Sequence, residues 1–141
     1  MSWAAAELKT AKLGNKRRNQ RLIKIVEDLA SKPSSSIPQA CRNAAAVQAA
    51  YDFFSNPRIK ASAIIAAHRE STIERALEHP LVLAIQDTTE LDYSHHRHKQ
   101  GLGPISNSKA NGLKLHSVLC VSDEGVPLGL LPHGVTTPSK H

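Results

Sequence analysis

The stretch LVLAIQDTTELDYSHHRH, residues 81–98, marks the point where the sequence changes from helical to strand-like patterning. Residues 81–86 are a short, mostly apolar run bounded by Pro80 and Asp87, a pattern typical of a central β-strand. Asp87 follows this run directly and precedes two threonines, two further acids and a group of histidines. A carboxylate at such a strand end is either a capped structural acid or a rigidly held ligand for a hard divalent cation.

After this stretch, the sequence predicts a long loop and then a hairpin. Residues 94–112 are rich in His, Gly, Asn and Ser and are typical of a loop. LKLHSVLCV at 113–121 alternates in the manner of a strand, and VPLGLL at 126–131 follows a turn. Three strands are therefore expected in the C-terminal half of the chain.

Before this stretch, three segments predict helices, over residues 15–32, 39–55 and 60–78. Asn15 is a candidate N-cap for the first of them. The residues of that helix that recur at helical spacing and should face a core are Leu22, Ile25, Val26 and Leu29. The sequence thus predicts an α+β chain with helices first and strands second.

The charge of the chain is concentrated in one region. The net charge is +6, and from Leu8 to Val26 there are seven Lys or Arg residues and no acid. A cationic block of this kind favours a polyanionic partner, with nucleic acid ahead of a membrane surface, although a solvated helix face would give the same pattern. The cations that we expect to contact phosphates are Lys16, Arg17, Arg18, Arg21 and Lys24.

Several other classes of protein and site find no support in the sequence. No stretch approaches the roughly 18 continuous apolar residues of a membrane span. Cys41 and Cys120 lie far apart without metal-ligand spacing, which favours a reduced, cytosolic setting. His95, His96 and His98 match no standard zinc pattern and favour a polar loop near nucleic acid instead.

In this order, the segments of the chain resemble the N-terminal portion of IS4-type (Tn5-like) Asp-Asp-Glu transposases. The matching stretches are LGNKRRNQRL (13–22), PQACRNAAAVQAAYDFFSNPRI (38–59), AIQDTTELDYS (84–94), GLGPISN (101–107), GLKLHSVL (112–119) and PLGLL (127–131). They are colinear and together span most of residues 8–131. The combination is more specific than any one of the stretches.

The resemblance implies two domains. Residues 1–78 would form a helical domain that binds double-stranded DNA at transposon ends. Residues 79–141 would form an incomplete ribonuclease-H-like catalytic domain that holds the first three strands of its core. The basic helix of the end-binding domain is matched by Lys16, Arg17, Arg18 and Arg21.

The resemblance also implies a chemistry, which is hydrolytic nicking of DNA followed by strand transfer, assisted by two Mg²⁺ ions. Asp87 matches the first aspartate of the catalytic triad and would be both a catalytic residue and a metal ligand. The other two acids would lie beyond residue 141. We therefore expect a truncated transposase of the bacterial cytoplasm that binds DNA and is not catalytic alone.

Two alternatives stay open at this point. The chain could be a Mg²⁺-dependent nuclease or strand transferase that is active only as a homodimer, or beside an intact transposase that supplies the missing acids. It could instead be a non-catalytic remnant that is inert or blocks transposon ends. Because a three-stranded piece of such a sheet would have an uncovered face and an unpaired edge, we expect the helical half to be the better ordered.

Overall fold

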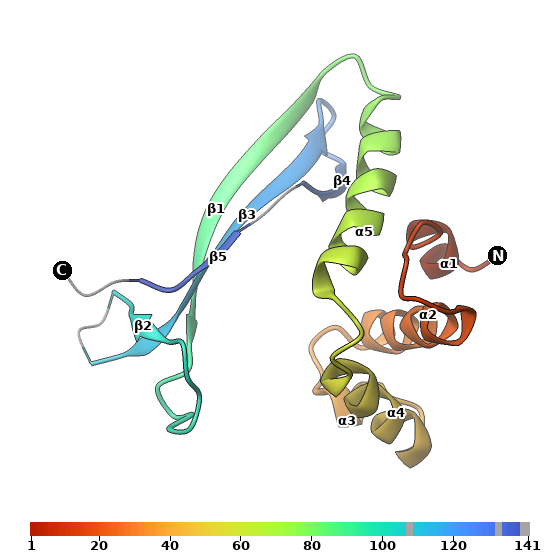
Figure 1. The fold of residues 1–141 in the computed structure, drawn as a ribbon. Helices are drawn as coiled ribbons and strands as arrows, with labels where there is room; N and C mark the ends of the chain where they lie inside the picture. The colour runs from red at the N-terminus through yellow and green to blue at the C-terminus, as the bar shows by residue number, and fades with distance from the viewer. Residues whose placement is uncertain (107–108, 132–133, 139–141) are drawn as a thin grey trace. The chain divides into compact units, whose positions relative to one another are not determined.

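The computed structural model describes residues 1–106, 109–131 and 134–138. The chain divides into two compact units, Met1–Ser71 and Thr72–His141. The first unit is helical and the second is built on an antiparallel sheet, which confirms the predicted α+β order (Figure 1). The division falls inside helix α5 (Ala61–Ala76), whereas the domain boundary after residue 78 stays a prediction.

The helical unit contains four complete helices and the first part of α5. They are α1 (Trp3–Glu7), α2 (Lys16–Ser31), α3 (Ile37–Ala40) and α4 (Ala44–Ser55). Asn15 caps α2 as predicted, because its side-chain oxygen accepts a hydrogen bond from the backbone N–H of Arg18 at 2.9 Å. The short helix α1 was not predicted, and it begins where the Ser2 hydroxyl accepts from the backbone N–H of Ala5 at 3.2 Å.

The prediction of one helix over residues 39–55 is wrong, because two helices occupy this region. Gln39 Oε1 accepts from the backbone N–H of Ser36 at 3.1 Å, which closes the first turn of α3. The chain then leaves the helical conformation at Cys41, which has φ −68° and ψ 145°. Asn43 starts α4 by accepting from the backbone N–H of Ala46 at 2.9 Å.

The core of the helical unit is aliphatic and alanine-rich, apart from the ring of Phe53. Its buried members are Leu8, Ala11, Leu13, Leu22, Ile25, Cys41, Ala50, Phe53 and Ala67. Val26 and Leu29 are half-buried against it, so the predicted inner face of α2 is confirmed. The Ser71 hydroxyl donates to the Glu7 carbonyl oxygen at 2.7 Å and ties α5 to α1.

The second unit has an antiparallel sheet centred on its longest strand. The strands are β1 (Val82–Asp92), β2 (Gly103–Pro104), β3 (Asn111–Ser122), β4 (Pro127–Leu130) and β5 (Gly134–Thr136). All four of the others pair with β3 (Figure 1). The three predicted strands correspond to β1, β3 and β4, and the short β2 lies inside the segment predicted as a loop.

The predicted extent and position of β1 are wrong in two respects. The strand continues past residue 86 to Asp92, because Thr88 and Thr89 suit a pleated ladder and pair with His116 and Leu115. In the described part of the chain β1 pairs only with β3, so it is an edge strand and not a central one. The unpaired edge that we expected of this sheet is thus on β1.

The last turns of α5 cover part of one face of this sheet. Arg75 Nε donates to the Leu128 carbonyl oxygen at 2.6 Å, and the side chain of Thr72 is fully buried. Gly129 has φ +140°, and a Cβ there would collide with Thr72 Oγ1. Glycine is therefore required where α5 crosses β4.

Candidate nucleic-acid interface

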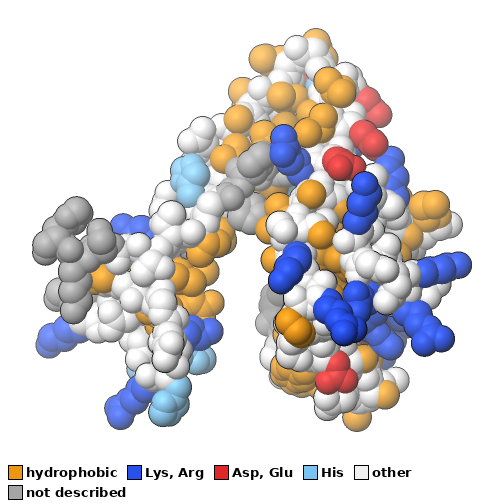
Figure 2. All heavy atoms as spheres, viewed as in Figure 1, with side chains coloured by type: hydrophobic (Ala, Val, Ile, Leu, Met, Phe, Trp, Pro, Cys, Tyr) orange, Lys and Arg blue, Asp and Glu red, His pale blue; other side chains and the backbone are white. Residues whose placement is uncertain are grey.

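The predicted DNA-binding cations lie along the outer side of α2. Because Leu22 and Ile25 fix the inner side, Lys16, Arg17, Arg21 and Lys24 are left exposed. Arg18 is half-buried, and its Nη1 donates to the Leu13 carbonyl oxygen at 3.0 Å. Figure 2 shows Lys and Arg side chains gathered over the helical unit.

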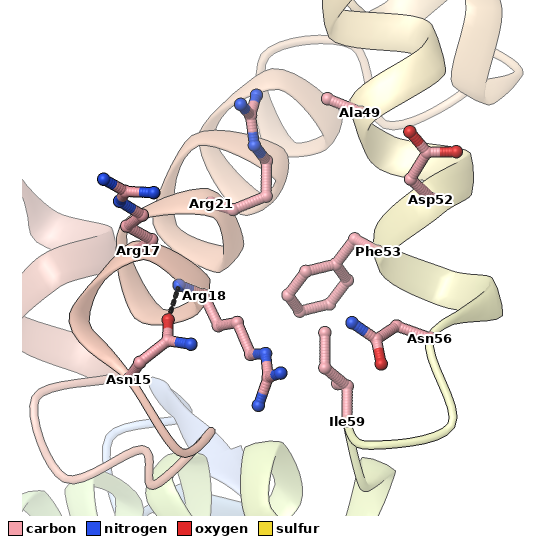
Figure 3. A pocket seen from close by; sticks show the side chains of 9 residues that line it. All are labelled: Asn15, Arg17, Arg18, Arg21, Ala49, Asp52, Phe53, Asn56 and Ile59. Carbon is pink, nitrogen blue, oxygen red and sulfur yellow. Dashed lines mark hydrogen bonds between the residues drawn. The ribbon is translucent and has the colours of Figure 1, made fainter.

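An open groove of about 350 Å³ lies between α2 and α4 (Figure 3). Its residues are Asn15, Arg17, Arg18, Arg21, Ala49, Asp52, Phe53, Asn56 and Ile59. Three arginines stand on the α2 side, whereas the opposite side is formed by the aromatic ring of Phe53, the aliphatic side chain of Ile59, one carboxylate, and small or amide side chains. We call this hollow the α2–α4 groove.

A second hollow of about 270 Å³ extends the cationic surface along α2. It is lined by Arg21, Lys24, Asp28, Arg42, Asn43, Ala45 and Ala46. Arg21 borders both hollows, so the two are adjacent along α2. The buried carboxylate of Asp28 accepts from Arg42 Nε at 2.7 Å and holds this arginine beside the start of α4, while most of its side chain stays exposed.

The sequence analysis did not select Arg42 and Asn43, which line the second hollow, as candidate interface residues. It assigned both to the interior of a continuous helix, whereas Asn43 is the N-cap of α4. A helix N-terminus carries partial positive charge, and exposed Ala44 and Ala45 leave room for an anion to approach it. The available signal was an asparagine followed by a run of alanines, which is a helix start and not a helix interior.

Asp87 lies in the middle of β1, opposite Ser117, and its side chain is exposed. Since side chains alternate along an unbroken strand, Glu90 and Asp92 project from the opposite face of the sheet. The Ser106 hydroxyl, which donates to Glu90 Oε1 at 2.7 Å, holds the pKa of Glu90 below 4.5, and Lys114 lowers it further. The structure therefore does not bring these acids together with Asp87.

Asp92 forms hydrogen bonds with a neighbouring residue of the chain. Its carboxylate accepts from the hydroxyl and the backbone N–H of Ser94, and these bonds lower the pKa of Asp92 below 3.8. Across the described ranges, no three His, Cys, Asp or Glu side chains are gathered to hold a metal ion. One exposed carboxylate is too few ligands for Mg²⁺ in a catalytic site, so these residues alone do not fit the implied metal pair.

Within the part of the chain that the structure describes, no helix combines the length and apolarity that crossing a bilayer requires.

A comparison with protein families gives a positive assignment for the first unit. Residues 1–59 match the family described as transposase DNA-binding. The match covers α1 to α4, and with them every residue of the α2–α4 groove. The N-terminal 59 residues of this chain are therefore a transposase DNA-binding domain.

Proposed function

We propose that this chain binds the ends of an IS4-type transposon through the continuous cationic surface formed by α2, Arg42 and the start of α4. The observation that carries this proposal is the adjacency of the two hollows, which share Arg21. Exposed Arg17, Arg21 and Lys24 have the reach to neutralise phosphates, and the N-terminus of α4 adds backbone N–H donors. Lys16 extends the same surface at the start of α2.

The arginines of α2 have different parts in this proposal. Arg18 bonds the Leu13 carbonyl and so shapes the turn before α2 as well as the groove. Arg17 and Arg21 are exposed, and among the described residues neither side chain makes a hydrogen bond or an ion pair that would give it such a structural task. Replacing them removes charge from the surface while leaving the fold intact, which makes them the informative pair.

A salt titration tests this proposal on the full chain with a fluorescently labelled DNA duplex. Arg17→Ala combined with Arg21→Ala should weaken binding and reduce the slope of log affinity against log salt by up to about 1.8, since each lost phosphate contact contributes about 0.9. Arg69→Ala, an exposed arginine of α5 outside both hollows, is the matched control and should reduce neither quantity to that extent. An unchanged slope in the double variant would contradict the proposal.

Arg42 provides a second test that the sequence alone did not suggest. Arg42→Ala removes a cation beside Asn43 but also leaves the buried Asp28 without its partner. Asp28→Asn combined with Arg42→Ala removes both charges and avoids the stranded carboxylate. We expect this double variant to fold and to bind DNA more weakly than the wild type. Equal affinity would restrict the interface to α2.

We further propose that Asp87 occupies the position of the first acid of an Asp-Asp-Glu triad on a ribonuclease-H-like sheet. The support is the resemblance of AIQDTTELDYS and the position of Asp87 on the long strand β1. Catalysis with Mg²⁺ would need further acids from outside the described residues. In such a site, Asp87 would supply one carboxylate ligand.

Nicking of supercoiled DNA distinguishes binding alone from this assembled activity. The chain should not nick DNA in Mg²⁺ by itself at any protein concentration, and Asp87→Asn should leave DNA affinity unchanged. If the chain nicks DNA with Mg²⁺ and Asp87→Asn abolishes the nicking, the assembled enzyme becomes the better account. If the chain does not nick DNA, a transposition assay with added intact transposase shows whether the chain occupies transposon ends or is inert.

A further inference from the structure

A turn in the second unit gathers cations and histidines that the α2–α4 groove does not use. Residues 95–99, HHRHK, follow β1 and are all exposed. Among the described residues, these five line an open hollow of about 550 Å³, and none of them is acidic. Figure 2 shows His side chains beside Lys and Arg side chains on the sheet-containing unit. We call this segment the histidine turn.

The backbone of the histidine turn is held by its neighbours. The Ser94 backbone N–H donates to Asp92 Oδ1 at 2.8 Å, and the His96 backbone N–H donates to the Tyr93 carbonyl oxygen at 2.8 Å. The Tyr93 ring lies edge-on to the His96 ring, with centroids 5.6 Å apart, and Lys99 Nζ sits 4.3 Å from the Tyr93 centroid. The charged side chains therefore project from a folded turn.

The electrostatic surroundings of the histidine turn are positive. From Tyr93 to Ser122 the sequence contains no Asp or Glu. Among the described residues, the titratable or charged groups that face the three histidines are Asp92 beside His95, Tyr93 against His96, and Arg97 and Lys99 within the turn. The Asp92 carboxylate is already bonded to Ser94. Histidine in general is the side chain that becomes a cation on mild acidification, and three histidines stand here beside Arg97 and Lys99.

Two ligand chemistries suit a histidine cluster, and the geometry favours one. A metal ion needs three or more convergent ligands, which the described residues do not provide. Binding to DNA phosphates requires exposed cations, and these cations do not have to converge on one point. We propose that the histidine turn is a second contact to DNA phosphates, whose strength increases as its histidines become protonated.

This inference rests on the proposed function for its partner, because the DNA is the one held by the helical unit. A duplex bound at one site raises the effective concentration of phosphates at a second site in the same chain. A modest cluster of cations can then contribute to affinity even if it would not bind DNA alone. Its contribution should be small near neutral pH, where Arg97 and Lys99 carry the charge.

The experiment measures the DNA affinity of the full chain by fluorescence anisotropy at about pH 7.5 and about pH 5.5, at one salt concentration and with EDTA present. Wild type should bind roughly tenfold more tightly at the lower pH, as expected for three exposed charge contacts. A variant that combines His95→Gln, His96→Gln and His98→Gln should lose most of this increase and keep its affinity at the higher pH. Matching far-UV circular dichroism excludes unfolding as the cause.

Two comparison variants separate this inference from the proposed function. His116→Gln replaces an exposed histidine of β3 outside the turn and should retain the full pH effect. Arg17→Ala with Arg21→Ala should weaken binding at both pH values while keeping their ratio. If the triple glutamine variant keeps the wild-type ratio while the α2 variant weakens binding, the histidine turn is not a DNA contact and the proposed function stands.

The remaining outcomes also decide the matter. No binding of DNA by the wild type at either pH overturns the proposed function and this inference together. Affinity that falls with acidification overturns the inference, and so does histidine-dependent DNA binding that appears only when EDTA is replaced by Zn²⁺, which would identify the histidines as metal ligands. Histidine-dependent binding to vesicles of anionic phospholipid, without an effect on DNA affinity, would identify a lipid surface as the partner and overturn the inference.

Discussion

In the helical unit, Leu22 and Phe53 retain 3% and 4% of their accessible surface, whereas Leu83 and Ile85 on β1 retain 48% and 50%. Both pairs are large apolar residues in regular secondary structure, so the difference lies in what surrounds them. Short helices can surround a core with a few local connections. A sheet leaves apolar side chains exposed until another layer covers them.

The same contrast appears in the backbone. In the first turns of α2 and α4, a backbone N–H group donates to the side chain of the N-cap residue, which is Asn15 in α2 and Asn43 in α4. In the described residues, β1 has a partner strand on only one side. The helix starts of the helical unit thus find their hydrogen-bond partners inside that unit. On this ground we expect the helical unit to be better ordered than the sheet. Amide hydrogen exchange would test this, with slower exchange expected in α2 and α4 than along β1.

The largest expected effect comes from the core of the helical unit. Phe53→Ala should lower the free energy of unfolding by about 3–5 kcal/mol, because it removes a buried ring and leaves a cavity. The adjacent Phe54, which is 54% exposed, is the matched control, and Phe54→Ala should cost much less. Urea unfolding followed by far-UV circular dichroism measures both. Equal losses would mean that the helical unit has no such core.

The N-cap of α4, which the sequence analysis missed, should contribute less to the free energy of unfolding than the core. Asn43→Ala removes the side-chain acceptor for the Ala46 N–H and should lower the free energy of unfolding by about 1 kcal/mol. Asn43→Asp keeps an acceptor and should stay close to wild type. A similar loss in both variants would mean that α3 and α4 do not depend on this cap.

Changing the exposed face of β1 should affect association more than stability. Ile85→Lys should change the free energy of unfolding by no more than about 1 kcal/mol, since half of the side chain is already in water. The added charge should reduce self-association through the open edge of β1. Sedimentation velocity at several protein concentrations measures this effect. A large loss of stability would indicate that this face is covered in solution.

The smallest expected effect is on the titration of Glu90. Its lowered pKa means that the Ser106 contact stabilises the fold above pH 4.5, and that this contribution is lost as pH falls through the folded-state pKa. Ser106→Ala should raise the pKa of Glu90 toward 4.5, as measured by carboxyl-carbon NMR. Asp92, held by Ser94, should titrate as before in the same sample. An unchanged Glu90 pKa would mean that Ser106 is not its main partner in solution.

The sequence by itself determined the features that depend on neighbours along the chain. The start of α2 at Asn15, its inner face of Leu22 and Ile25, and the order of helices before strands all follow from periodicity and capping within a few turns. The concentration of cations between Leu8 and Val26 likewise indicated the kind of partner that the transposase DNA-binding match supports. These signals are local, so they are present in the sequence in full.

Only the tertiary structure decided the features that depend on distant residues. Because β1 pairs with β3 along its whole length, the strand extends past Asp87 to Asp92. Side chains alternate along β1, so Asp87 and Glu90 lie on opposite faces of the sheet. The contact of Arg42 with Asp28, 14 positions earlier, placed a cation beside α4 that the sequence analysis did not select. Strand register and ion pairs between elements form only when the chain has folded, and no local pattern encodes them.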